Sequence, residues 1–139
     1  MKNDLKGDIR QTSIQTKKYR VMIVDDEQDI TMIFKIGLEK NEFVVTTFNN
    51  SLEALSKFKA GIYDLLILDI RMPGMNGFQL YQKIRELDKK VKVCFLTAFD
   101  EYRGEFTRSF PFLDEVNCYL KKPITIQDLI KRLTDLANS

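Results

Sequence analysis

The sequence contains no histidine among its 139 residues. Histidine is the side chain whose charge changes nearest to neutral pH, and it is the commonest side-chain ligand for metals. Its absence therefore excludes histidine-based general acid–base catalysis, histidine-ligated metal sites and any role as a phosphohistidine carrier.

Cysteine is also scarce, with only Cys94 and Cys118 present. The two are far apart in the sequence and lie in or beside apolar runs, unlike the closely spaced pairs of redox and zinc sites. This pattern is typical of small core residues in a reducing compartment. We therefore expect two buried thiols and no disulfide.

Long apolar runs are missing as well, since none approaches the roughly 18 residues that a membrane-spanning helix needs. The N-terminus is polar and lacks the apolar segment of a secretory signal. We expect a cytoplasmic protein without a membrane partner. The net charge is only +2 and the basic residues are scattered, so we do not expect direct nucleic-acid binding.

The bulk composition is that of a globular protein, with 44% hydrophobic and 30% charged residues. The length suits one domain with a substantial core. Residues 1–18 are polar without a sustained period and predict a flexible N-terminal extension. The regular pattern begins at residue 19, so we place a single domain at residues 19–139.

Five short apolar runs alternate with helical patterns in this domain. The predicted strands are residues 19–24, 43–48, 64–69, 91–96 and 118–122. The central runs are continuously apolar, which is typical of a parallel sheet with both faces covered. We therefore expect an α/β fold, a doubly wound five-stranded parallel sheet with helices on both faces.

The helical segments each carry an apolar face at helical spacing. The residues expected to point inward are Ile30, Ile33, Phe34 and Leu38; Leu52, Leu55 and Phe58; Phe78, Leu80, Tyr81, Ile84 and Leu87; and Leu129, Ile130, Leu133 and Leu136. Residues 100–117 have a less regular pattern, in which glycine and proline interrupt a fourth helix.

Reactive side chains follow four of the predicted strands. They are Asp25 and Asp26 after the first strand, Asp69 at the end of the third, Thr97 after the fourth, and Lys121 and Lys122 in the fifth. In an open parallel sheet, ligands bind outside the carboxyl ends of the strands. If these strands are neighbours, three carboxylates, a hydroxyl and an ammonium group converge on one pocket.

Three carboxylates in one pocket cannot all stay ionised without a counter-charge. A hard divalent cation with oxygen ligands, Mg²⁺ by availability, meets that need and also neutralises an incoming phosphoryl group. Asp69 is the candidate nucleophile that could form an acyl phosphate. Asp25 and Asp26 come from one chain turn and are better suited to holding the metal.

Four segments together resemble a known family. They are MIVDDE (22–27), LLILDIRMPGMNGFQL (65–80), CFLTAFD (94–100) and YLKKPI (119–124). The chain resembles the receiver domain of two-component response regulators, the CheY-like fold, over essentially all of residues 19–139. The resemblance implies the strand order 2-1-3-4-5.

The resemblance also implies roles at the phosphorylation site. Asp69 would accept a phosphoryl group from the phosphohistidine of a sensor histidine kinase or from a phosphotransfer protein. Asp26 would bind Mg²⁺ directly and Asp25 largely through water. The backbone carbonyl of Arg71 would complete the metal site.

Further residues match positions that the family uses for switching. Thr97 would be the switch hydroxyl and Tyr119 the aromatic side chain that follows it inward. The family's lysine directly precedes a proline, which selects Lys122 and leaves Lys121 solvated. The resemblance implies a cis peptide bond between Lys122 and Pro123.

The function that follows is that of a single-domain response regulator. It would catalyse its own phosphorylation and dephosphorylation without turning over an external substrate, so we do not expect an enzyme. It would signal to an unknown downstream protein through the 100–119 region and the last helix.

Three alternatives stay open from the residues. A degenerate receiver would act as a phosphorylation-independent interaction module. A Mg²⁺-dependent phosphohydrolase would favour a second aspartate where Arg71 stands. A flavodoxin-type module would expect a phosphate-binding loop where the acidic residues 25–27 stand.

Overall fold

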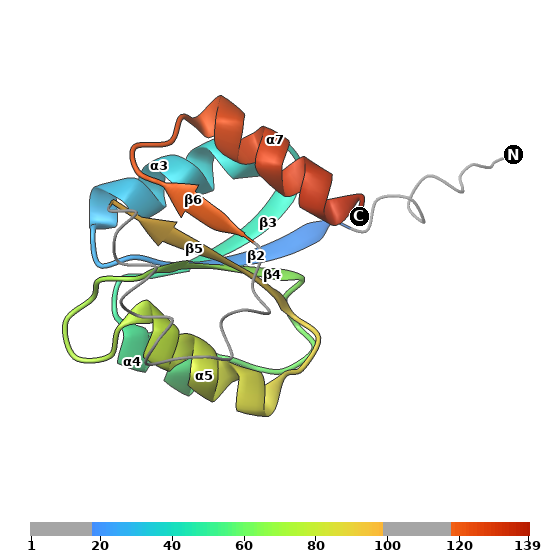
Figure 1. The fold of residues 1–139 in the computed structure, drawn as a ribbon. Coiled ribbons are helices and arrows are strands. Elements are labelled where there is room, and N and C mark those ends of the chain that lie inside the picture. The colour runs from blue at the N-terminus through green and yellow to red at the C-terminus, as the bar shows by residue number, and fades with distance from the viewer. Residues whose placement is uncertain (1–17, 99–117) are drawn as a thin grey trace, which may run out of the picture.

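A computed structural model describes residues 18–98 and 118–139 of the chain (Figure 1). In chain order the elements are β2 (Tyr19–Val24), α3 (Gln28–Glu39), β3 (Phe43–Phe48), α4 (Ser51–Lys57), β4 (Leu65–Asp69), α5 (Gly77–Leu87), β5 (Lys92–Thr97), β6 (Tyr119–Lys121) and α7 (Ile126–Ala137). The predictions for the N-terminal extension up to residue 17 and for residues 100–117 lie outside the described residues.

The strands form one parallel sheet in the order β3-β2-β4-β5-β6. Counted along the chain, this is the order 2-1-3-4-5. Figure 1 shows α3 and α7 on one face of the sheet and α4 and α5 on the other. The predicted fold class is therefore confirmed, and no strand limit differs from the prediction by more than one residue.

The core consists of two apolar clusters, one on each face of the sheet. Met22, Leu68 and Phe95 belong to the cluster beneath α4 and α5, whereas Ile23 and Ile67 belong to the one beneath α3 and α7. Alternate residues of β2 and β4 thus serve opposite clusters, which explains their continuous apolar runs. Among the described helices, none is both long and apolar enough to cross a membrane.

The prediction of an inward-facing side chain is wrong for three residues. Ile33, Leu52 and Leu87 are 59%, 60% and 55% exposed. The smaller Thr31 and Ala54 are buried on α3 and α4 instead. Apolar spacing alone did not show which edge of each helix meets the sheet, because a small side chain on the contact face allows a closer approach.

The prediction of two free thiols is wrong, because Cys94 and Cys118 form a disulfide with a Cα–Cα distance of 4.6 Å. Both cysteines are buried, as expected for core residues. They lie one step before the paired residues Phe95 and Tyr119 on the neighbouring strands β5 and β6. A separation of 24 residues in the sequence concealed this contact, which depends on the parallel pairing of the two strands.

Asp88, at the C-terminal end of α5, is a buried carboxylate that fixes two loops. Its oxygens accept hydrogen bonds from the backbone N–H groups of Gly61 (3.0 Å), Lys90 (2.9 Å) and Val91 (3.1 Å). The bond from Gly61 and the others from the backbone lower the pKa of Asp88 despite its burial.

Replacing Asp88 by alanine is expected to lower the free energy of unfolding by about 2 kcal/mol, since three N–H groups lose a charged acceptor. A carboxyl with a lowered pKa stabilises the fold above its unfolded value of 3.8 and loses this contribution as the pH falls through the folded value. Urea unfolding at pH 7 and at acidic pH measures both effects. Asp135→Ala, at an exposed position of α7, is the matched control and should change little.

Candidate functional site

The carboxyl end of β2 delivers two aspartates in different environments. Asp25 is fully buried, whereas Asp26 is exposed. The Asp25 Oδ1 atom accepts a hydrogen bond of 2.9 Å from the backbone N–H of Glu27. The Asp25 carbonyl accepts another of 2.8 Å from the side-chain amide of Asn49. Asp25 is therefore held rigidly at the tip of a central strand.

The carboxyl end of β4 delivers Asp69, which is 5% exposed. The chain then turns sharply into α5, which begins at Gly77 after an Asn76 capping box. The Ile70 N–H donates to the Leu96 carbonyl at 3.1 Å, and the Gly77 N–H donates to the Ile70 carbonyl at 2.9 Å. These bonds anchor the corner directly behind Asp69.

Gly77 is required by this close packing. A Cβ atom at this position would meet the backbone carbonyl of Asp69 and lie 3.0 Å from the Ile70 Cα. Both contacts are with backbone, which cannot rotate away as a flexible side chain can. The glycine thus lets the start of α5 rest against the peptide group that carries the candidate nucleophile.

The variant Gly77→Ala is expected to destabilise the protein by about 2 kcal/mol, the cost of forcing extra volume into a packed site. The corner after Asp69 must shift, so occupation of the site by a divalent cation should weaken as well. Thermal unfolding with and without Mg²⁺ measures both. Gly61→Ala, at a glycine whose Cβ would meet nothing within 4 Å, separates the packing effect from simple loss of a glycine, although its positive φ adds its own strain.

Lys122 follows β6 and reaches back across the site. Its Nζ atom lies 3.0 Å from Asp25 Oδ2, 3.0 Å from Glu27 Oε1 and 3.6 Å from Asp69 Oδ1. Its backbone N–H donates to the Thr97 carbonyl at 2.7 Å, and a cis peptide bond joins it to Pro123. Lys121 is exposed instead, so the structure brings Lys122 rather than Lys121 to the carboxylates.

Burial and crowding shift the ionisation of this cluster. Desolvation and the nearby charge of Asp25 raise the pKa of Asp69 to about 7. Desolvation also raises the pKa of Asp25, even though the Glu27 N–H and Lys122 oppose the shift. Burial by itself would lower the pKa of Lys122, but its bonds to Glu27 and Asp25 raise it above the usual value.

The acidic cluster has the composition of a site for a hard cation. Asp25, Asp26 and Asp69 each offer a carboxylate oxygen, and these atoms all lie within 4.8 Å of one another. Among the described residues, Lys122 is the cation that forms ion pairs with Asp25, Glu27 and Asp69. Burial and the charge of Asp25 both raise the pKa of Asp69, and a divalent cation would favour the ionised form again.

The two switch candidates lie on the neighbouring strands β5 and β6. Thr97 is buried at the end of β5. Tyr119 starts β6, and its half-buried ring lies 5.7 Å from that of Phe95, within the cluster beneath α4 and α5. Arg71 is exposed beside the corner, and a role for its carbonyl in metal binding stays a prediction.

Two residues of this site were missed by sequence reasoning. Glu27 was considered only as part of an acidic run, yet it shares Lys122 with Asp25. Gly77 was considered only as part of a motif, although its missing side chain admits the carbonyl of Asp69. The acidic residue that ends DDE could have indicated Glu27. The role of Gly77 depends on a three-dimensional contact that the sequence does not show.

Residues 21–134 match the family model described as the response regulator receiver domain. This match covers most of the chain and every residue of the site described above. The chain belongs to the response regulator receiver domain family. Receiver domains of this family belong to two-component systems, and the CheY-like sheet of this chain agrees with that assignment.

A curated relative of this receiver domain is the uncharacterized transcriptional regulatory protein YkoG of Bacillus subtilis. The two are 32% identical over 118 residues, which is 84% of this chain and 50% of the relative. The chain spans about half the length of the first curated relatives it matches.

Solved structures agree with the receiver fold. A CheY-like receiver domain from Methanospirillum hungatei has a TM-score of 0.77 at 24% identity, with 88% of this chain and 95% of that chain covered. The response regulator TrrA from Thermotoga maritima, solved in complex with Mg²⁺ and BeF, has a TM-score of 0.72 at 34% identity, with 85% and 98% covered. The first shows the fold alone, and the second also supports the family.

Proposed function

We propose that Asp69 accepts a phosphoryl group from the phosphohistidine of a sensor kinase or phosphotransfer protein, in a Mg²⁺-dependent reaction. The observation that carries the proposal is the position of Asp69, buried at the tip of β4 within 3.6 Å of the Lys122 ammonium group. The acidic cluster around it and the family assignment add support.

In the proposed reaction, an ionised oxygen of Asp69 attacks phosphorus as the bond to the donor nitrogen breaks. The donor imidazole keeps the electron pair of that bond, and Asp69 becomes an acyl phosphate. Lys122 is placed to hold one phosphoryl oxygen as negative charge spreads over the transferred group. The ammonium group would then exchange part of its contact with Asp25 and Glu27 for the phosphoryl oxygen.

The residues proposed to hold Mg²⁺ are Asp25, Asp26, the Asp69 carboxylate and the backbone carbonyl of Arg71. A divalent cation would supply the positive charge that keeps the carboxylates ionised together and neutralises the phosphoryl oxygens. The carboxylates of Asp25 and Asp26 suit such an ion, because their oxygens lie within 4.8 Å of those of Asp69. Burial of Asp25 fixes its oxygens without the cost of ordering a mobile side chain.

Phosphorylation is proposed to shift the balance between two packings of β5 and β6. The hydroxyl of Thr97 would bond the new dianion, and the Tyr119 ring would follow it toward the core. The 5.7 Å contact between the rings of Tyr119 and Phe95 supports an aromatic packing that is sensitive to such a movement. The changed surface would include α7 and control the binding of a downstream protein, with the remaining predicted surface in residues 100–117 outside the described part.

We further propose a cytoplasmic regulator that turns over no external substrate. It would modify only itself, since the acyl phosphate and its hydrolysis both take place at Asp69. A protein partner is preferred to DNA because the net charge is only +2 with dispersed basic residues.

Incubation with Mg²⁺ and a small phosphodonor, read by intact mass, tests the proposal. The wild type should gain one phosphoryl group, Asp69→Ala should gain none, and Asp135→Ala should behave as the wild type. Chelation of the metal should suppress the gain. A wild type that gains no phosphoryl group under these conditions would contradict the proposal and favour a degenerate receiver that acts by contact alone.

A further inference from the structure

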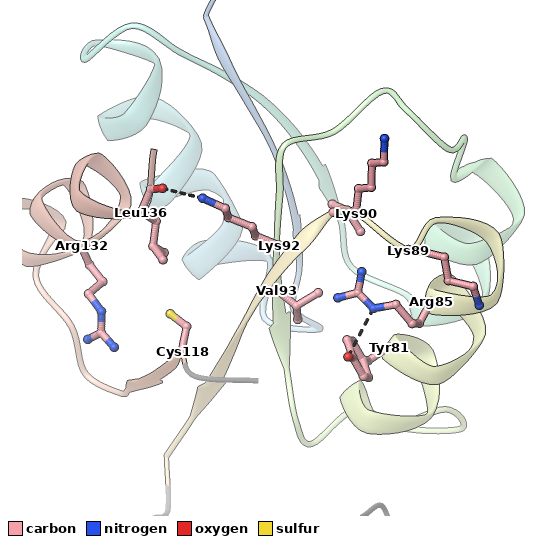
Figure 2. Close-up of a pocket in the computed structure, with 10 residues that line it drawn as sticks. Tyr81, Arg85, Lys89, Lys90, Lys92, Val93, Cys118, Arg132 and Leu136 are labelled. Carbon is pink, nitrogen blue, oxygen red and sulfur yellow. Dashed lines mark hydrogen bonds between the residues drawn. The ribbon is translucent and has the colours of Figure 1, made fainter. Parts of the chain in front are cut away.

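A hollow of about 590 Å³ lies at the amino end of β5, at the edge of the sheet opposite Asp69. Figure 2 shows that α5 and α7 contribute side chains from the two faces of the sheet. β5 begins at Lys92, whereas β6 first pairs with it at Phe95. The hollow therefore lies beside the first residues of β5, where β6 does not yet pair with it.

The charge of this hollow has one sign among the described residues. Its cations are Arg85, Lys89, Lys90, Lys92 and Arg132, and no carboxylate of the described part lines it. The Arg85 and Lys92 side chains bond neutral groups there, the Tyr81 hydroxyl at 3.3 Å and the Leu136 carbonyl at 2.8 Å (Figure 2). Asp88, the C-cap of α5, does not line the hollow; its carboxylate accepts three backbone N–H bonds and also feels the charge of Arg85.

Cys118 forms part of the wall of the same hollow. Figure 2 shows its sulfur among the lining side chains, in the region of Arg132 and Leu136. Cys118 is 4% exposed, whereas its disulfide partner Cys94 is fully buried. Of the two cysteines, Cys118 lines the strongly basic hollow and Cys94 does not.

We propose that the Cys94–Cys118 disulfide is a thiol–disulfide exchange site for small anionic thiols, which the basic hollow guides to the Cys118 sulfur. This rests on the proposed cytoplasmic location, because a disulfide in a reducing compartment is usually transient and redox-sensing. The carboxylates of such a thiol would be attracted by the five cations, which raises its local concentration. The cations also favour the thiolate form of Cys118 after reduction.

The exchange takes two steps, each of which conserves electrons. The thiolate of the small thiol attacks the Cys118 sulfur, a mixed disulfide forms, and Cys94 leaves as a thiolate that takes up a proton. A second thiolate then attacks the sulfur of the bound small thiol. This step releases a small-molecule disulfide and the Cys118 thiolate. Two small thiols are oxidised for each protein disulfide reduced, and the reverse sequence re-forms the bond.

The exchange has a direct structural consequence for β6. This strand has three residues and pairs only with β5 in the described part, through three register positions. The disulfide adds a covalent link directly before Tyr119 and three residues before Thr97. Its reduction should loosen β6, and a resulting change in switching rests on the proposed roles of Thr97 and Tyr119.

The first test measures the rate of disulfide reduction by mercaptosuccinate and by cysteamine, an anionic and a cationic thiol. Alkylation of the freed thiols and intact mass give the rates, each divided by the concentration of thiolate. The anionic-to-cationic ratio should fall about tenfold or more in Lys90→Gln/Arg132→Gln. The control Lys83→Gln/Lys131→Gln changes one lysine on α5 and one on α7, both outside the hollow. It should keep the wild-type ratio.

The same anionic-to-cationic rate ratio in the wild type and in Lys90→Gln/Arg132→Gln would overturn the guided exchange. Cysteines that stay reduced under mild oxidation would overturn it as well. The second test is amide hydrogen exchange, in which reduction should lower the protection of Tyr119–Lys121 about tenfold or more, with β2 unchanged. Unchanged protection of β6 would overturn the structural consequence. Neither readout uses phosphorylation, so failure of the proposed function would be visible separately by intact mass.

Discussion

Lys122→Met is expected to slow phosphorylation of Asp69 about 100-fold or more. Lys122 is the only cation within 4 Å of the carboxylates in the described part of the site. In the proposed reaction it stabilises charge on the transferred phosphoryl group, and removing one such preorganised donor typically costs a factor of 100 to 1,000. Methionine keeps an unbranched apolar chain of comparable length, so the change removes mainly the charge. The rate of phosphoryl gain, followed by intact mass, measures the effect.

The same substitution should destabilise the metal-free protein by about 3 kcal/mol. Asp25 is fully buried, and in the described part of the chain only Lys122 forms an ion pair with its carboxylate. The loss should be smaller with excess Mg²⁺, because a divalent cation supplies positive charge to the same oxygens. Urea unfolding in chelator and in Mg²⁺ separates the two conditions.

Lys121→Met is the matched control, since Lys121 is the preceding residue and is exposed. It should leave both the rate and the stability near those of the wild type. Equal effects at the two positions, or a larger one at Lys121, would contradict the assignment of Lys122.

Asp69→Asn is expected to stabilise the metal-free protein at alkaline pH, by about 3 kcal/mol, while it abolishes phosphoryl acceptance. Burial and the charge of Asp25 raise the pKa of Asp69 from 3.8 to about 7. Each unit of such a shift corresponds to about 1.4 kcal/mol, and the share that belongs to Asp69 alone is reduced by its coupling to Asp25. Asparagine has nearly the same shape and does not ionise.

The sign of the pH dependence follows from proton binding. Between pH 3.8 and about 7, folded Asp69 holds more protons than the unfolded chain, so the wild type loses stability as the pH rises. This contribution is fully present below 3.8 and is lost as the pH passes through the folded value. Wild type and Asp69→Asn should therefore be equally stable at acidic pH and diverge above neutrality.

Addition of Mg²⁺ should reverse the order at alkaline pH. Mg²⁺ at 100 times its dissociation constant would stabilise the wild type by about 2.7 kcal/mol, and less in the variant, which lacks one anionic oxygen ligand. Thermal unfolding across pH, with and without Mg²⁺, provides the measurement. A wild type more stable than Asp69→Asn at pH 9 in chelator would contradict the account of crowded carboxylates.

The fold could be predicted from the sequence because local patterns determine it. Continuous apolar runs such as LLIL in β4 indicated strands buried on both faces, and the structure confirms them. The alternation of strands and helices then favoured a parallel doubly wound sheet. The strand order itself came from the resemblance to receiver domains rather than from any local pattern.

The candidate site could be predicted as far as it depends on strand ends. Asp25, Asp69 and Thr97 follow or end buried strands, and a parallel sheet brings those ends to one edge. The structure places them there together with Lys122. Which of two adjacent lysines enters the site was again set by family resemblance.

The features that the sequence did not reveal are contacts between distant segments. The Cys94–Cys118 disulfide depends on the register of β5 against β6. The close approach of Gly77 to Asp69 depends on how the start of α5 packs against the backbone of Asp69 and Ile70. The exposure of Leu52 depends on the rotation of α4 about its axis, which an apolar stripe does not determine.

We expect Asp69, and neither of its neighbours Asp25 and Asp26, to carry the phosphoryl group. Borohydride reduction converts an acyl-phosphorylated aspartate to homoserine, which peptide mass spectrometry locates in the sequence. After incubation with Mg²⁺ and a phosphodonor, homoserine is expected at position 69, with unchanged aspartates at 25 and 26. Homoserine at 25 or 26, or at no position in a protein that has gained a phosphoryl group, would contradict it.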